Sequence, residues 1–393
     1  MLEEKYDFQS TYTLLPQSPL IHFQWDQNGA ALRATEVKPK LDRYIIKRLG
    51  ESNIPSGWRN NQSPGALNYK LRIVADGVPE TTLLGYISRK KAKTLEEKDY
   101  AFKGCPYDIF YGNTGDVSEK RGVTVDMKLT VDCFIKELRE YIDSVIGDFF
   151  IVTNFGTMQS KGFGSFIVDG KKNDPNHICQ TLIAEYQANA CYRFKASKSP
   201  FKQIKCLYSL MKTGVNQSYM DPPAYRRSIL FDYMHEQGFG NEKAWLKQKH
   251  IAPALGKKVD QNDEKSRYVR ALFGIGEEIE FKNSLEDAND KVSVKIKDSE
   301  EKIERLNSPV FFKVINHTVY YIGMPINEEI YGKTFTFSSN MGRGEISVPR
   351  KEDLPEDFIN DFMHYAFTKL NIYSAEFRDI KGLRLEEVKR NGK

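Results

Sequence analysis

Cysteine is scarce in this 393-residue chain, and its spacing excludes two common uses of it. The five cysteines contain no C-x-x-C pair and stand at Cys105, Cys133, Cys179, Cys191 and Cys206. An odd count in a long chain without an export signal favours reduced thiols packed in a core over a disulfide scaffold. His177 and Cys179 have the spacing of half a zinc site, but no second spaced pair follows, so we expect no metal.

Long hydrophobic runs are also missing. Apolar runs such as Phe149–Val152 are far shorter than the roughly 20 residues that a membrane helix needs. The opening residues, MLEEKYDFQS, are polar and acidic and lack the apolar core of a signal peptide. We therefore expect no membrane partner and a cytoplasmic protein.

Charge of one sign is barely in excess, since 58 Lys and Arg stand against 53 Asp and Glu for a net charge of +5. A protein that wraps an RNA backbone is often more basic, so local clusters carry more information than the total. The 40% apolar and 12% aromatic content is typical of a globular protein, and the length predicts two domains.

The first 172 residues alternate between strand and helix patterns. We expect strands at Thr11–Phe23, Tyr69–Ala75, Val123–Leu129 and Phe166–Val168, with an extended segment at Phe149–Thr153, and helices at Glu36–Leu49 and Asp132–Ile146. Pro39 fits if it lies in the first turn of its helix, and Gly50 is a plausible helix stop. The order β-α-β-β-α-β is the ferredoxin-like pattern, which RNA-recognition folds share, and it leaves one sheet face free for a ligand.

A polar turn at Lys171–Asn176 predicts a boundary between a first domain, residues 1–172, and a second, residues 173–393. From Cys179 to Leu255 the pattern is mostly helical, and afterwards it is rich in strands. The expected helices are Phe201–Met211, Tyr225–His235, Asn241–His250 and Glu356–Leu370, and the clearest strands are Lys291–Ile296 and Val310–Tyr321. The fold class is therefore α+β throughout. Whether the second half is a diverged copy of the first is left open by the sequence.

A glycine-rich loop, NFGTMQSKGFGS at residues 154–165, is the most informative segment. Gly156, Gly162 and Gly164 permit backbone conformations that let a phosphate approach main-chain N–H groups, and Lys161 adds a positive charge. The alternative is a tight turn whose glycines only relieve steric clashes. The spacing is neither the Rossmann fingerprint nor a Walker A loop, because no helix follows whose N-terminus would bind phosphate.

Three segments together resemble a known family. The loop KGFGS after an amphipathic helix resembles the loop that defines the repeat-associated mysterious proteins (RAMP) of CRISPR systems. Residues 18–48, SPLIHFQWDQNGAALRATEVKPKLDRYIIKR, are similar to the start of the RAMP subunit at the crRNA 3′ end of type III-B (Cmr) complexes. NSPVFFKVI at 307–315, preceded by Arg305 and by ALFG at 271–274, resembles a strand motif of related subunits. The loop departs from the family in carrying Gln159-Ser-Lys161 where several arginines are usual.

The resemblance implies a ferredoxin-like RAMP domain followed by a helical segment and a second, diverged RAMP-like domain. It implies a subunit that binds crRNA and target RNA in antiviral defence beside other RAMP subunits, without a cofactor. The expected RNA-binding residues are Gly156, Lys161, Gly162, Gly164 and Ser165 of the loop, Arg33, Lys38, Lys40 and Arg43 of the first helix, and Arg89, Lys90 and Lys91 of the long connection. For the charged residues, a merely solvated surface is the alternative.

The second hypothesis is a RAMP endoribonuclease that uses His22 as a general base or Asp26 to assist cleavage. His22 lies within an apolar strand pattern without an acid partner nearby in the sequence. Asp26 belongs to the polar turn DQNG, where Asp is favoured for conformational reasons. We therefore expect a protein that binds RNA and is not an enzyme.

Overall fold

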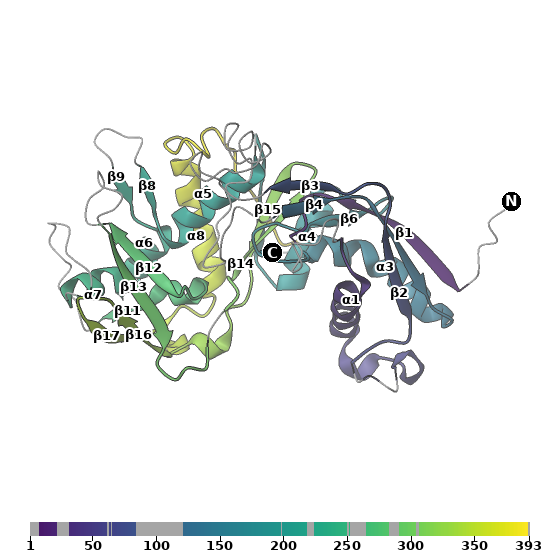
Figure 1. The fold of residues 1–393 in the computed structure, drawn as a ribbon, viewed down its shortest axis with the longest axis horizontal. Coiled ribbons are helices and arrows are strands. Elements are labelled where there is room, and N and C mark those ends of the chain that lie inside the picture. Colours follow the sequence, from purple (N-terminus) through teal and green to yellow (C-terminus); the bar gives the residue numbers. More distant parts are fainter. Residues whose placement is uncertain are drawn as a thin grey trace, which may run out of the picture.

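The structure is a computed structural model that describes residues 8–21, 31–60, 63, 65–83, 121–197, 199–217, 224–249, 251, 265–282, 291–303 and 306–391. Of the residues singled out above, His22, Asp26, Arg89, Lys90, Lys91, Cys105 and Arg305 lie outside the described residues. The chain forms two domains that lie side by side, with the first at the right of Figure 1 and the second at the left.

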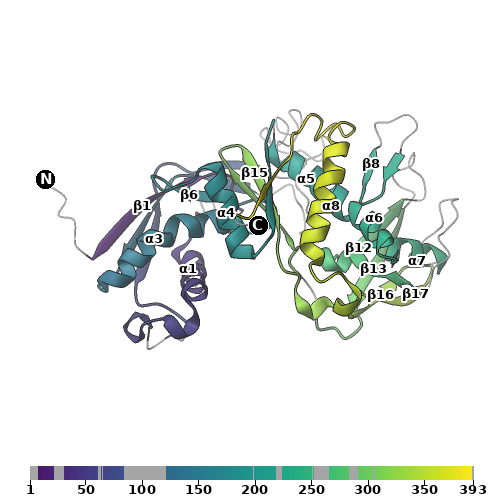
Figure 2. The same ribbon diagram turned by 180° about the vertical axis from the view of Figure 1, so that it is seen from behind.

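The first domain has a four-stranded antiparallel sheet covered on one face by two helices (Figures 1 and 2). Its elements are β1 Gln9–Pro16, α1 Ala34–Leu49, β2 Lys70–Ala75, β5 Met127–Asp132, α3 Lys136–Val152 and β6 Phe166–Val168. The sheet order β2-β5-β1-β6 is that of a ferredoxin-like fold. This confirms the predicted β-α-β-β-α-β order. A small hairpin, β3 Glu80–Leu83 and β4 Arg121–Thr124, is inserted before β5.

Alternation along the strands decides which face of this sheet is covered. Tyr12 and Leu14 of β1 and Leu129 and Val131 of β5 are buried under the helices. The residues between them point to the opposite face, because successive side chains on a strand alternate in direction. That opposite face contains the exposed Thr11.

Several predicted boundaries were wrong. Helix α3 ends at Val152, so Phe149–Val152 is helical and not extended, and the glycine-rich loop directly follows a helix. The apolar stripe of α3 continues through Phe149 at helical spacing, which explains the longer helix. Helix α1 begins at Ala34, which places Pro39 in the second turn instead of the first. The expected strand Val123–Leu129 is divided between the end of β4 and the start of β5.

The second domain repeats the same topology. Its core elements are β7 Ala190–Lys195, α5 Pro200–Lys212, β14 Val310–Ile315, β15 Thr318–Gly323, α8 Phe358–Tyr373 and β18 Glu386–Lys389. The sheet order β14-β15-β7-β18 matches that of the first domain element by element. The second half is therefore a second ferredoxin-like unit, which the sequence left open.

Strand β7 corrects one prediction, because it lies in the stretch that we expected to be mostly helical. The strand ACYRFK is buried on both sides over most of its length and so has no clear polar–apolar alternation. The expected strand Val310–Tyr321 is a hairpin of β14 and β15 that turns at Asn316 and His317, both with positive φ.

The remaining elements extend the second domain and join the two halves. They are α4 Pro175–Tyr186, β8 Val215–Gln217, β9 Ala224–Arg226, α6 Ile229–Glu236, β10 Gly240–Asn241, α7 Glu242–Gln248, β11 Ser266–Arg267, β12 Glu278–Lys282, β13 Lys291–Asp298, β16 Thr334–Ser338 and β17 Arg343–Ser347, with short 3₁₀ turns at Glu51–Asn53, Ser56–Trp58, Val269–Phe273, Glu328–Ile330 and Lys351–Asp353. Strands β12, β13, β16 and β17 form a separate sheet. Helix α4 packs between α3 and the second sheet.

Two hydrophobic cores result. One fills the first domain and continues through α4 to the outer face of the second sheet at Phe311 and Tyr320, so the domains share apolar packing. The other lies within the second domain. Cys133, Cys179, Cys191 and Cys206 are buried free thiols, as predicted. Among the described residues, no helix is long and apolar enough to cross a membrane.

Candidate nucleic-acid interface

A cleft of about 600 Å³ lies where α1, the segment after α3, and the second domain meet. It is lined by Lys40, Arg43, Tyr44, Lys47, Val152, Thr153, Asn154, Gly156, Met158, Gln159, Ser160, Glu185, Tyr186, Asn307, Phe311 and Met324. Pockets of several hundred Å³ are large enough to hold a small organic group. The lining contains three cations from one helix and aromatic side chains from other elements.

The three cations follow helical spacing, so Lys40, Arg43 and Lys47 share one face of α1. Arg43 is exposed, and its guanidinium donates to the Pro39 carbonyl one turn earlier at 3.2 Å. Lys47 is also exposed and pairs with Glu185 of α4 at 2.7 Å. Arg43 therefore places positive charge at the mouth of the cleft, where the charge of Lys47 is shared with Glu185.

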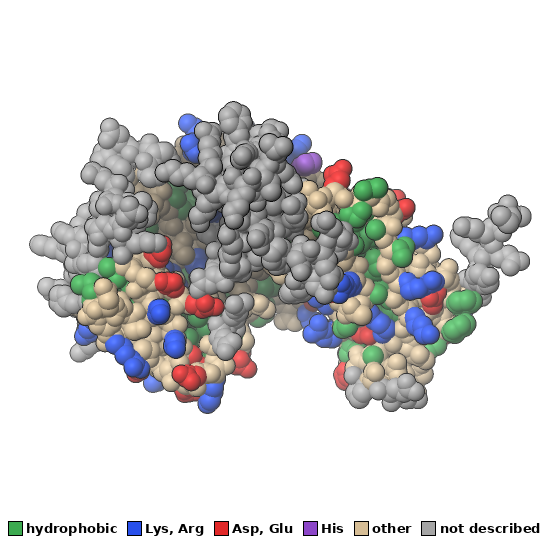
Figure 3. All heavy atoms as spheres, in the orientation of Figure 1, with side chains coloured by type: hydrophobic (Ala, Val, Ile, Leu, Met, Phe, Trp, Pro, Cys, Tyr) green, Lys and Arg blue, Asp and Glu red, His purple; other side chains and the backbone are tan. Residues whose placement is uncertain are grey.

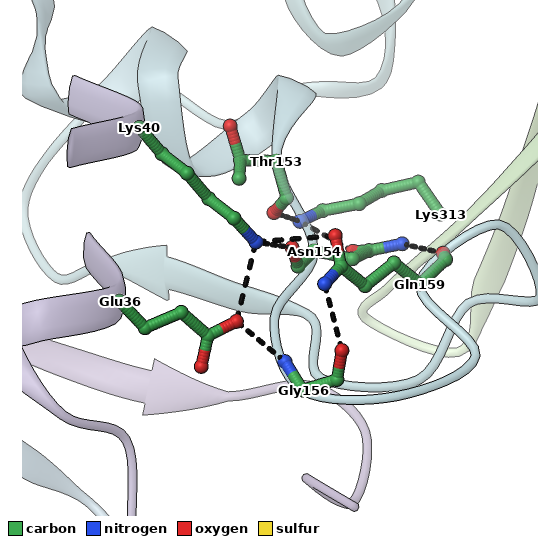
Figure 4. A network of polar contacts seen from close by, with 7 residues as sticks. All are labelled: Glu36, Lys40, Thr153, Asn154, Gly156, Gln159 and Lys313. Atoms are coloured by element: carbon green, nitrogen blue, oxygen red, sulfur yellow. Dashed lines mark hydrogen bonds and ion pairs between the residues drawn. The ribbon is translucent and has the colours of Figure 1, made fainter. Parts of the chain in front are cut away.

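Lys40 lies deeper and connects α1 to the loop, as Figure 4 shows. Its ammonium pairs with Glu36 at 3.2 Å and donates to the Asn154 carbonyl and to Gln159 Oε1, each at 3.1 Å. Burial lowers the pKa of Lys40, and the neighbouring Glu36 opposes that effect. Lys40 thus has a structural role in the lining of the cleft, where it holds the loop against α1.

Lys313 anchors the same loop from the second domain. Its buried ammonium donates to the Phe150 carbonyl at 2.6 Å. It also donates to the Thr153 carbonyl at 2.8 Å and to Asn154 Oδ1 at 3.0 Å, as Figure 4 shows. Two of these acceptors are carbonyls at the C-terminal end of α3, where unpaired carbonyls and the helix dipole favour a cation. Burial lowers the pKa of Lys313.

The glycines of the loop do not present their N–H groups to a ligand. The N–H of Gly156 donates to Glu36 Oε1 at 2.8 Å, that of Gly162 to the Gln159 carbonyl at 3.3 Å, and that of Gly164 to the Pro19 carbonyl at 2.9 Å. The prediction that these three N–H groups are open to phosphate was therefore wrong.

Close packing explains why these positions are glycine. All three have positive φ, and a Cβ on Gly164 would lie 2.0 Å from the Phe155 carbonyl oxygen. A Cβ on Gly162 would lie 3.1 Å from Val314 of the second domain. The steric alternative stated for the loop is the correct one, because its C-terminal half is clamped against β14.

Lys161 and Ser165 are also turned inward. The Lys161 ammonium lies 3.1 Å from the centre of the Tyr208 ring and, within the described chain, has no hydrogen-bond partner. Burial holds its pKa well below the usual value. Ser165 Oγ donates to the Val314 carbonyl at 2.7 Å. The prediction that Lys161 offers its charge to RNA at the loop surface was therefore wrong.

The predicted basic residues of α1 divide into two groups. Lys40 and Arg43 line the cleft, whereas Arg33 lies exposed at the start of the helix and does not. Lys38 pairs with Asp42 at 2.7 Å and lies over the Tyr69 ring, away from the cleft. Sequence reasoning placed Lys47 in the same basic helix but did not choose it, although its spacing from Arg43 was the available signal.

Aromatic residues of the cleft were also missed, since they come from distant parts of the chain. Tyr186 of α4 donates to the Val152 carbonyl at 2.7 Å, and its ring centre lies 5.4 Å from that of Phe311 on β14. No sequence spacing relates these two residues. In the part of the chain that the structure describes, no three His, Cys, Asp or Glu side chains gather as around a metal ion.

Comparison with known proteins gives the family. The Cmr1 N-terminal domain family matches residues 7–215, and the Cmr1 C-terminal domain family matches residues 225–389. The chain is similar to the crystal structure of Cmr1 from Pyrococcus furiosus in its apo form, with a TM-score of 0.40 and 7% identity over 98% of this chain and 99% of that one. No curated protein matches the sequence. Because the two domain families together span nearly the whole chain, it belongs to the Cmr1 family, which confirms the resemblance to a RAMP subunit of type III-B complexes.

Proposed function

We propose that this chain is a non-catalytic RNA-binding subunit that grips the 3′ region of crRNA, target RNA, or both, through the cleft beside α1. Membership of the Cmr1 family implies a subunit of a type III-B Cmr effector complex, with the other subunits as protein partners. The proposed setting is antiviral defence in the cytoplasm.

The observation that supports the proposal is the exposed cationic pair Arg43 and Lys47 at the mouth of a cleft with aromatic lining. Two cations one helical turn apart suit successive phosphates of a single strand, and each phosphate contact adds salt-dependent affinity. Tyr186 and Phe311 supply the apolar surface that a base needs. The proposal therefore transfers the RNA contact from the glycine N–H groups to the side chains of α1.

The test is a titration of fluorescein-labelled single-stranded RNA against the full chain, followed by anisotropy. The double variant Arg43→Glu with Lys47→Glu should lose at least about tenfold in affinity, because two attractive contacts become repulsive. The matched control is Lys381→Glu, an exposed lysine that does not line the cleft. Equal affinity of the double variant and the control would exclude the cleft, and a wild-type chain that binds no RNA at low salt would exclude the function.

The absence of catalysis needs its own test, since His22 and Asp26 lie outside the described residues. Labelled repeat RNA and target RNA are incubated with the chain, with and without Mg²⁺. We expect both RNAs to remain intact. Cleavage that disappears in His22→Ala or Asp26→Ala would replace the binding-only proposal with the endoribonuclease alternative.

A further inference from the structure

The face of the first sheet that the helices leave uncovered is polar and basic. Three rows of paired residues cross β2, β5 and β1 on this face: Lys70, Asp132 and Gln9; Arg72, Thr130 and Thr11; Val74, Lys128 and Thr13. Most of these side chains are exposed. Figure 3 shows Lys and Arg side chains over β2 on this side of the molecule.

Within these three rows cations outnumber carboxylates, and the exposed Asp76 and Asp126 follow at the end of β2 and just before β5. Asp132 contributes the one carboxylate of the three rows, and it is already occupied by Gln9 at 2.7 Å and Arg72 at 3.3 Å. Lys70 and Lys128 are exposed and, among the described residues, form no ion pair. Two cations thus remain available for a negatively charged ligand.

An aromatic pair lies at the outer end of the sheet, beside the row of Gln9 and Asp132. Phe134 is 84% exposed and stacks on Phe8, with ring centres 4.6 Å apart. The two residues flank the row of Gln9 and Asp132 in the chain, and the N–H of Cys133 donates to the Phe8 carbonyl at 2.8 Å. A phenylalanine exposed to this extent next to lysines offers a ring face on which a base can stack.

We propose that this sheet face is a second RNA-binding surface, on which Lys70 and Lys128 contact phosphates of a single strand and Phe134 stacks one base. Three rows span about 13 Å along the strands, which suits a segment of two or three nucleotides. The surface contacts the RNA backbone and the ring face of one base, so we expect it to have little sequence preference. The inference rests on the proposed RNA-binding function but not on the cleft.

RNA suits this face better than a protein partner does. The centre of a protein–protein interface is depleted of charged residues and rich in apolar ones, whereas this face exposes Arg72, Lys128, Thr11 and Thr13, with Thr130 buried between them. A single strand of RNA matches such a surface, since backbone phosphates need cations and hydroxyl donors.

The experiment uses the full chain and a fluorescein-labelled 20-nucleotide oligouridylate, with anisotropy as the readout. We compare Lys70→Glu with Lys128→Glu as a double variant, Phe134→Ala alone, and Lys172→Glu as the control. Lys172 is an exposed lysine of the same domain that lies off this face. The double variant should lose about tenfold in affinity and Phe134→Ala about fivefold or more, which is the stacking contribution of one base. The control should bind like wild type.

Ultraviolet cross-linking with peptide mapping adds a readout that a structural defect would not mimic, and we expect cross-links at Phe134 or Phe8. If the sheet variants bind like wild type while the cleft variants do not, this inference fails and the proposed function stands. If they keep RNA affinity but lose incorporation into the assembled complex, the face docks a protein subunit and the inference is likewise overturned. A wild-type chain that binds no RNA would contradict both the proposed function and this inference.

Discussion

The ammonium of Lys313 lies 3.0 Å from Asn154 Oδ1, and this hydrogen bond joins β14 of the second domain to the loop that follows α3 in the first. The amide of Asn154 returns a hydrogen bond to the Phe312 carbonyl at 2.9 Å. The lysine belongs to the segment NSPVFFKVI, which resembles a strand motif of related RAMP subunits, and it connects the two domains.

Lys313→Met should destabilise the protein by about 3 kcal/mol, because three buried oxygen acceptors lose their donor at once. Urea unfolding followed by tryptophan fluorescence measures the change. Lys295→Met, at an exposed position on β13, is the control and should change stability by less than about 0.5 kcal/mol. Equal midpoints for the two variants would mean that the contact contributes nothing.

Gly164→Ala and Gly170→Ala form a matched pair that separates packing from backbone strain. Both glycines have positive φ, at +66° and +71°, but a Cβ on Gly164 would collide with the Phe155 backbone, whereas one on Gly170 would meet open space. Gly170→Ala should therefore cost about 1–2 kcal/mol. We expect Gly164→Ala to cost more than about 4 kcal/mol or to prevent folding, as measured by thermal unfolding. Similar losses at both sites would contradict the clamped loop.

Lys161→Met should stabilise the protein by about 1–2 kcal/mol at pH 7, because it removes a buried ammonium that has no hydrogen-bond partner among the described residues. Lys202→Met, at an exposed position on α5, should have little effect. The measurement is again the urea midpoint. A loss of RNA affinity without a gain in stability would instead indicate that Lys161 contacts RNA.

The lowered pKa of the buried Lys212 makes the stability of the protein depend on pH in a definite direction. Burial, assisted by the nearby Arg270, lowers its pKa to about 7, and Glu242 opposes the shift. The unfolded chain, whose lysine pKa is near the ordinary value, binds the proton more tightly between these two pKa values. The free energy of unfolding should therefore rise as the pH increases above about 7, and it should be flat with respect to this group below that pH.

Between pH 7 and 9 the contribution of Lys212 should be about 2 kcal/mol. Because Lys243 has its pKa lowered to about 7 in the same way, the test compares the wild type with Lys212→Met. Unfolding in urea at pH 6, 7.5 and 9 should show a smaller rise for the variant. Parallel curves for the two proteins would show that the proton on Lys212 does not affect folding.

Salt dependence tests the role given to Arg43. The logarithm of the RNA association constant should fall linearly with the logarithm of salt concentration, and Arg43→Ala should reduce the slope by about 0.7, the value for one phosphate of a single strand. Anisotropy titrations from 50 to 300 mM KCl measure both slopes, with the salt steps chosen so that the affinity changes by about fourfold from one to the next. An unchanged slope would show that Arg43 does not contact phosphate.

The local elements were predictable where the pattern was local. The stripe of Leu138, Ile142 and Val145 identified α3, and the alternation of Leu71 and Ile73 identified β2, because helix and strand periods appear directly in the order of residues. The order of those elements was enough to predict the ferredoxin-like first domain. Buried β7 was missed, because a strand covered on both faces loses its alternation.

The candidate site depended on contacts that no local pattern encodes. The sequence by itself determined the glycine spacing, the basic face of α1 and the motif around Lys313. Only the tertiary structure decided that the loop glycines face β14 and that Lys161 lies on Tyr208. It also decided that Arg43 and Lys47 remain exposed beside Tyr186 and Phe311. The physical reason is that packing between the domains determines which polar groups form hydrogen bonds inside the protein. These contacts join residues more than a hundred positions apart, so no local pattern reveals them.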